Sequence, residues 1–165
     1  MSQTQFITGK ILLDKTGEVL KLKNEAKEML NKHYSDIDTN INELNKYGIW
    51  DMLDDLQDAL ENNREDFDFI YYCNLDKLLN LYMRQIKFSY NKKTIFGNIT
   101  SEIVRNKYLL EEIPDKEICE LIKNCIVISD IKERMNNYGL LTNKILDKTS
   151  GFDIDKFKFK SQVDY

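Results

Sequence analysis

Apolar residues recur at three- and four-residue steps along most of this chain, the spacing that places them on one face of an α-helix. The pattern predicts a first amphipathic helix over residues 18 to about 32 and a second whose apolar stripe runs from Ile41 to Leu60 and ends at Asn62-Asn63. A third helix, over about 65–87, has a stripe wide enough for the centre of a bundle. We expect it to be the most buried element.

Three further helices are predicted after this central one. A short helix at about residues 100–111 has to stop before Pro114, because proline disfavours helical backbone in the residue that precedes it. Asp115 is placed to begin the next helix, and Ser129 or Asp130 the last long one. Short polar side chains accept hydrogen bonds from the unpaired amides at a helix start, so these residues are predicted to be N-caps.

The two ends of the chain carry a different pattern. Residues 6–13 have apolar side chains on both sides of Gly9 and end at the turn signal Lys15-Thr16-Gly17, which predicts one strand and a turn. A lone strand cannot complete a sheet, so this segment is either an extended arm or a strand with partners outside this chain. Gly151 suits the end of the last helix, and alternation in residues 152–165 predicts an extended strap.

These elements predict a mainly all-α chain, a helical bundle with one short N-terminal strand or extended arm. We expect three parts: a residual strand or arm over residues 1–17, the helical bundle over 18–150 and an extended tail over 151–165. The 165 residues, 42% of them hydrophobic, are enough to bury one core.

Charge and cysteine content narrow the class of protein. Charged residues make up 32% of the chain but are mixed in sign, and a net charge of −4 favours neither nucleic acid nor an anionic membrane as partner. Cys73, Cys119 and Cys125 form no CxxC pair and lie in apolar helical patterns, so we expect buried free thiols and a reducing, cytoplasmic compartment. No apolar run approaches the roughly 20 residues that span a bilayer, and we expect a soluble protein without a membrane partner.

Residues 33–40, "HYSDIDTN", contain two aspartates one residue apart, a pattern that binds Mg²⁺ in nucleotidyltransferases. There the aspartates share one face of a strand and follow a Gly-Ser turn whose amides hold the triphosphate. Here they follow a predicted helix, and the chain has no Gly-Ser pair. We therefore interpret Ser35, Asp36, Asp38 and Thr39 as capping residues. We predict no catalytic residue and no metal ligand in this chain.

Two other polar clusters are candidate sites. Asp51 and Asp55 share a helix face and are candidates for a general base or for outer-sphere acids near a metal, while the alternative is a solvated helix surface. In "MRQIKFSYNKK", cations surround a tyrosine at the end of the predicted central helix; cations suit phosphates, and the ring can stack on a base. The alternative for this stretch is a solvated loop. The candidate nucleotide-binding residues are Arg84, Lys87, Tyr90, Lys92 and Lys93.

A family resemblance is distributed along the chain. "GKILLDKTGEVLKLKNEAKEML" resembles the junction that closes the catalytic domain of many small bacterial nucleotidyltransferases of the polymerase-beta-like superfamily. The stretches "IWDMLDDLQDALENN", "LYMRQIKFSYNKK" and "GFDIDKFKFKS" are similar in order and character to the C-terminal helical domain of those enzymes. The resemblance covers nearly the whole chain but lacks the Gly-Ser turn, the aspartate pair and the third carboxylate. It implies a substrate-binding domain without its catalytic half, from a truncated gene, a split protein or an expressed fragment.

The resemblance also implies an activity for the complete enzyme, which uses Mg²⁺ and a nucleoside triphosphate to transfer a nucleoside monophosphate to a hydroxyl. This chain is then expected to bind and position the acceptor, without a cofactor of its own and without catalysis. Its partner is a nucleotidyltransferase catalytic domain or a second copy, and its ligand a small molecule or nucleotide. A second hypothesis is a stand-alone interaction protein, such as an antitoxin-like regulatory partner. Aminoglycoside, protein side chain and RNA end all stay open as acceptors, because pocket shape decides that choice.

Overall fold

The computed structural model describes residues 10–30, 37–88 and 90–158. Within these ranges the chain is helical and contains no strand, which confirms the prediction of a mainly all-α bundle. The helices in chain order are α2 (Glu18–Leu30), α3 (Thr39–Glu61), α4 (Phe67–Gln85), α5 (Ile95–Thr100), α6 (Glu102–Tyr108), α7 (Lys116–Val127) and α8 (Ile131–Asp147), followed by the 3-10 turn η1 (Ile154–Lys156).

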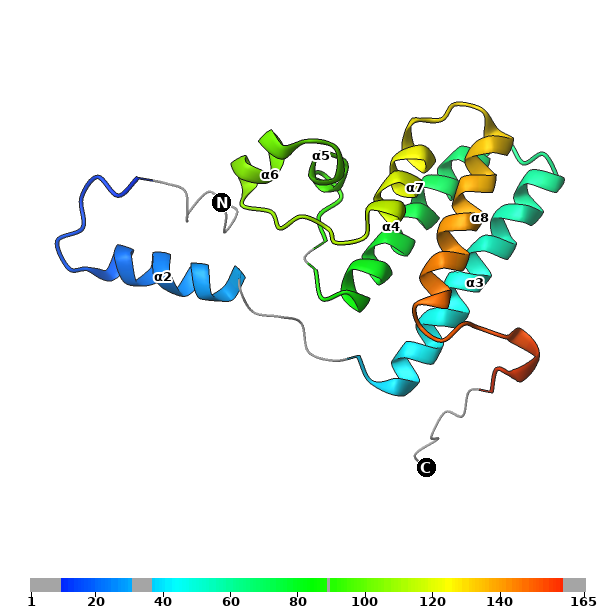
Figure 1. Cartoon of the computed structure of the whole chain (residues 1–165), viewed down its shortest axis with the longest axis horizontal. Helices are drawn as coiled ribbons and strands as arrows, with labels where there is room; N and C mark the ends of the chain where they lie inside the picture. The colour runs from blue at the N-terminus through cyan, green and yellow to red at the C-terminus, as the bar shows by residue number, and fades with distance from the viewer. Residues whose placement is uncertain (1–9, 31–36, 89, 159–165) are drawn as a thin grey trace.

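Helices α3, α4, α7 and α8 form the bundle, with α5 and α6 at one side (Figure 1). The predicted central helix, α4, shares the most buried position with α8, which packs against α7, α3 and α4. The sequence pattern does not predict how deeply α8 is buried, because three of the buried positions of α8 are the polar residues Arg134, Asn137 and Thr142. The apolar stripe alone therefore underestimates the number of α8 residues that are buried in the bundle.

One hydrophobic core fills the bundle. Its largest fully buried side chains include Ile49, Leu56, Tyr71, Leu78, Tyr82, Met83, Ile118, Ile122, Tyr138, Leu141 and Ile145. The predicted stripe of α3 is correct from Ile49 onwards, but Ile41 and Leu44 are exposed, because the first turns of α3 extend past the other bundle helices (Figure 1). Burying a side chain of this size stabilises the fold by roughly 1.5–3 kcal/mol.

Helix starts in the second half of the bundle follow the predicted capping chemistry. The Asp115 side chain accepts a hydrogen bond from the Ile118 amide at 3.0 Å and caps α7. Asp130, rather than Ser129, caps α8 and accepts from the Glu133 amide at 2.8 Å. Both interactions satisfy amides that a helix leaves unpaired in its first turn.

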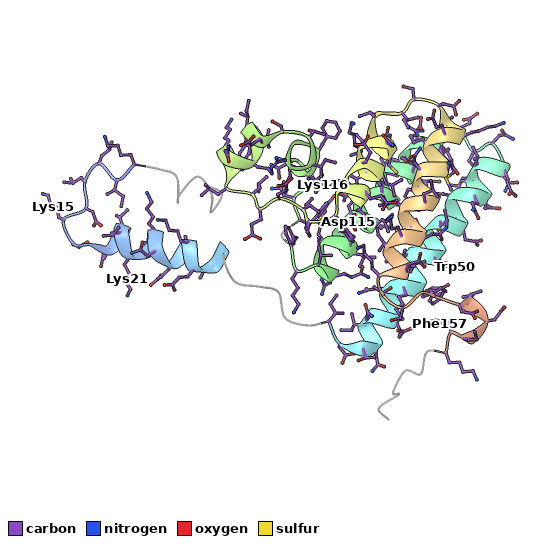
Figure 2. The ribbon with its side chains drawn as sticks, viewed as in Figure 1. Lys15, Lys21, Trp50, Asp115, Lys116 and Phe157 are labelled. Atoms are coloured by element: carbon purple, nitrogen blue, oxygen red, sulfur yellow. The ribbon has the colours of Figure 1, made fainter. Side chains whose placement is uncertain are left out.

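Asp115, labelled at the start of α7 in Figure 2, provides a pH-dependent prediction. Partial burial opposes its ionisation, but the Lys148 ammonium at 2.7 Å and the Ile118 amide outweigh this effect and lower the pKa of Asp115. A lowered folded-state pKa gives stability that is present above the unfolded pKa, about 4, and is lost as the pH falls through the folded pKa. We expect Asp115→Ala to reduce the free energy of unfolding by about 1 kcal/mol at neutral pH and by less in acid.

Urea unfolding at neutral and at acidic pH measures this difference. Asp115→Asn is the control, because asparagine is an equally good cap but forms no ion pair with Lys148. An Asp115→Ala difference that stays constant as the pH falls would contradict the role of the ionised carboxylate.

The connection before α7 differs from the prediction. The single short helix expected at about 100–111 corresponds to α6, which is capped by the Ser101 hydroxyl accepting a hydrogen bond from the Val104 amide. Helix α5 directly precedes Ser101 and was not predicted. Gly97 lets the two helices approach, since a Cβ there would lie 2.7 Å from a methyl carbon of Val104. Helix α6 ends at Leu109, which has a left-handed backbone with φ 52°, before Pro114 is reached.

The chain ends also differ from their predicted forms. Described residues 10–17 form no strand, and Leu12 and Leu13 are 88% and 72% exposed, because no other described segment offers an edge to pair with. The extended-arm alternative therefore fits the described part, while residues 6–9 lie outside it. The predicted strap after α8 instead contains the turn η1, and Phe159 lies outside the described residues.

Aromatic packing holds the C-terminal segment against α3. Gly151, with φ 75°, donates its amide to the Leu146 carbonyl at 2.9 Å and turns the chain at the end of α8. The Phe157 ring then stacks on Tyr47 with centroids 5.1 Å apart, and Phe152 packs against both. Trp50 of α3, labelled in Figure 2, joins this group, with its ring centroid 6.2 Å from those of Tyr47 and Phe152.

Candidate functional sites

The predicted nucleotide-binding residues gather at the end of α4 and in the turn before α5. The exposed cations are Arg84, Lys87, Lys92 and Lys93. Tyr90 is half-buried against the core, and its hydroxyl donates a hydrogen bond to an Asp76 carboxylate oxygen at 2.5 Å. Burial and this carboxylate both raise the pKa of Tyr90. The ring is thus engaged in packing, and nucleotide binding at this corner stays a prediction that rests on the cations.

The predicted acidic pair lies on α3 beside Tyr47. Hydrogen bonding to Asp51, together with the charges of Asp51 and Asp55, raises the pKa of Tyr47. Asp51 is half-buried and Asp55 is exposed. Across residues 10–30, 37–88 and 90–158, no group of three or more histidine, cysteine, aspartate or glutamate side chains could hold a metal ion. The role of outer-sphere acids for Asp51 and Asp55 stays a prediction.

The aspartate pattern of "HYSDIDTN" falls only partly in the described residues. Asp38 is the N-cap of α3 and accepts hydrogen bonds from the Asn40 and Ile41 amides at 2.9 and 3.3 Å. This confirms the capping interpretation for Asp38, while Ser35 and Asp36 lie outside the described residues. Thr39 is the first residue of α3.

Sequence reasoning missed a polar cluster at the contact between α4 and α8. Arg134 is only 5% exposed, and its guanidinium lies over the Tyr71 and Tyr72 rings, 4.6 and 5.3 Å from their centroids. The guanidinium donates to the Tyr72 hydroxyl at 3.0 Å and pairs with Asp68. The available signal was an arginine in helical register with the apolar residues Tyr138, Leu141 and Ile145 of the last helix. Because the guanidinium lies against two rings and pairs with Asp68, we interpret the cluster as stabilising the bundle rather than forming a site.

Two shallow depressions lie on the bundle surface. A groove of about 290 Å³ between α3 and α8 has an apolar floor that includes Leu53, Leu60 and Met135. A pocket of about 270 Å³ between α5, α6 and α7 includes Asn98 and Cys119 in its lining. Neither depression brings the predicted site residues together.

The three cysteines are unpaired, and only Cys125 is fully buried.

The N-terminal segment, residues 10–30, exposes six large apolar side chains. Figure 1 shows α2 apart from the bundle, and Lys15 and Lys21 mark this segment in Figure 2. Within the segment, the Leu20 amide donates a hydrogen bond to an Asp14 carboxylate oxygen at 2.9 Å. Its exposed apolar side chains are Leu12, Leu13, Val19, Leu20, Leu22 and Met29. The amphipathic pattern of the predicted first helix is therefore correct, but its apolar face is uncovered.

The chain was compared with protein-family models, with curated proteins and with solved structures, and no match was found. None of the helices in the described ranges combines the length and the apolar character needed to cross a membrane.

Proposed function

We propose that this chain is a binding module whose helical bundle is attached to another protein through the N-terminal segment. The observation that carries this proposal is the uncovered apolar surface of residues 10–30. Four of its side chains, Leu12, Leu13, Leu22 and Met29, are between 53% and 88% exposed. Exposed apolar surface of this kind, gathered on one segment and rimmed by charges, marks sites of protein interaction.

The family resemblance supports a particular form of this proposal. In a nucleotidyltransferase-like protein the equivalent segment joins the helical domain to the catalytic domain, so the uncovered face would be the one that meets that domain. The bundle would then position an acceptor and leave transfer to its partner. The stand-alone regulatory protein is the second candidate, and the same uncovered face favours it, since it too requires a protein partner.

Lysine-directed cross-linking in cells that express the protein tests the proposal. The N-terminal segment carries the exposed residues Lys10, Lys15, Lys21 and Lys27, and the bundle offers Lys77, Lys92, Lys116 and Lys132 as a matched set. We expect cross-links to other polypeptides to concentrate on the first set. Cross-links spread evenly over both sets, or found only on the bundle, would overturn the proposal.

A further inference from the structure

We infer that the partner of α2 is a second copy of this chain, whose α2 packs parallel to the first in a short two-stranded coiled coil. This inference rests on the proposed function, since it names one occupant for the apolar face of the N-terminal segment. It requires a seam of apolar residues at coiled-coil spacing along α2. It also requires charged residues beside that seam that attract a second copy of α2 in one orientation and repel it in the other.

The seam is present at heptad spacing. Val19, Leu22, Ala26 and Met29 follow each other at steps of three, four and three residues, the a and d positions of two successive heptads. Val19, Leu22 and Met29 are 36%, 53% and 55% exposed, and α2 has no extensive contact with the bundle helices. In the first heptad, Val19 at a followed by Leu22 at d is the arrangement that favours two parallel strands, whereas the second heptad has Ala26 and Met29 at these positions.

The flanking charges select the orientation. Glu18 and Glu25 occupy g positions and Lys23 an e position. In a parallel pair each g residue faces the e′ residue five positions further along the partner, so Glu18 of each copy meets Lys23 of the other. In an antiparallel pair g faces g′ and e faces e′, which sets glutamate against glutamate and lysine against lysine. Opposite charges at these positions stabilise a coiled coil and like charges oppose it.

The length of α2 limits the strength of this contact. Thirteen residues give two heptads, a seam smaller than the interfaces of stable dimers, and an isolated helix of this length is marginal in water. We therefore expect association in the micromolar range or weaker. Pairing should also increase the helicity of α2, because each helix covers the apolar face of the other.

Sedimentation velocity of the full chain over a concentration series tests the inference with matched substitutions. Leu22→Ser, at a d position, should abolish the association, whereas Leu20→Ser should leave it unchanged, because Leu20 is equally exposed, at 52%, but lies at a b position outside the seam. Lys27→Glu, also at a b position, is the charge control for Lys23→Glu.

Charge exchange distinguishes the two orientations. Glu18→Lys or Lys23→Glu alone should weaken association roughly tenfold, and either an equimolar mixture of these two variants or the double variant should restore it. In an antiparallel pair, where Lys23 faces Lys23′, the double variant would instead stay weak, because it sets glutamate against glutamate; that outcome overturns the parallel arrangement.

A chain that stays monomeric throughout the concentration series overturns self-association. If cross-links to a different protein still concentrate on the N-terminal segment, the proposed function survives this failure. If those cross-links are also absent, both are overturned.

Discussion

Replacing Tyr71 by alanine is expected to lower the free energy of unfolding by about 3–5 kcal/mol, a large part of the stability of a small domain. Tyr71 is fully buried between α4, α7 and α8. Its ring packs against Phe67 and Tyr138, and its hydroxyl donates to the Cys125 carbonyl at 3.0 Å. The alanine variant loses the ring contacts, the hydrogen bond and the cation–π contact with Arg134, and it leaves a cavity where three helices meet.

Two conservative variants separate the ring from the hydroxyl. Tyr71→Phe should cost about 1 kcal/mol, because it removes the donor to the buried Cys125 carbonyl. Tyr138→Phe should be neutral or slightly stabilising, because the Tyr138 hydroxyl is buried with no hydrogen-bond partner among the described residues. Urea unfolding followed by Trp50 fluorescence and circular dichroism measures all three variants. If Tyr71→Phe and Tyr138→Phe lower the free energy of unfolding by the same amount, this assignment of the hydrogen bonds is contradicted.

Arg134→Ala is expected to have the second-largest effect, a loss of about 3 kcal/mol. The guanidinium is buried against the faces of Tyr71 and Tyr72 and donates to the Tyr72 hydroxyl. Its removal therefore costs packing, cation–π contact and a charge-assisted hydrogen bond together. Arg134→Lys should recover less than half of the loss, since an ammonium has neither the planar stacking surface nor the fork of donors.

The ion pair with Asp68 is expected to contribute much less than the ring contacts. The Asp68 side chain is 66% exposed, so water can solvate it when the pair is broken, and salt screens what remains. Asp68→Asn should therefore be far milder than Arg134→Ala in the same unfolding assay. If the two variants lose the same stability, the ion pair and not the aromatic contact secures Arg134.

The long helices could be predicted because their signals are local. The apolar steps of α3 and α7 and the capping aspartates Asp115 and Asp130 lie within a few residues of the structure they determine. Helix α5 was not predicted; its packing depends on how closely Gly97 lets it approach α6, and that is a tertiary contact. The buried position of Arg134 likewise depends on rings that lie more than 60 residues away in sequence.

The sequence predicted which residues belong to each candidate site, but not how their side chains are arranged. The cations Arg84, Lys92 and Lys93 are exposed near the end of the central helix, as the spacing indicates. Whether Tyr90 faces them or the core depends on Asp76, a residue on α4 that the local pattern does not connect with it. The amphipathic character of α2 was visible in the sequence, but amphipathicity alone does not show whether an apolar face is covered by the same chain.

Amide hydrogen exchange of the full chain tests most directly whether the N-terminal segment is a docking surface rather than part of the bundle. At low protein concentration we expect the amides of α3, α4, α7 and α8 to exchange slowly and those of Leu12, Leu13 and α2 to exchange rapidly, because only the former have tertiary contacts that resist opening. Protection of α2 should then rise with protein concentration. Strong protection of residues 10–30 that does not change with concentration would show that the bundle itself covers the segment, and would contradict the account.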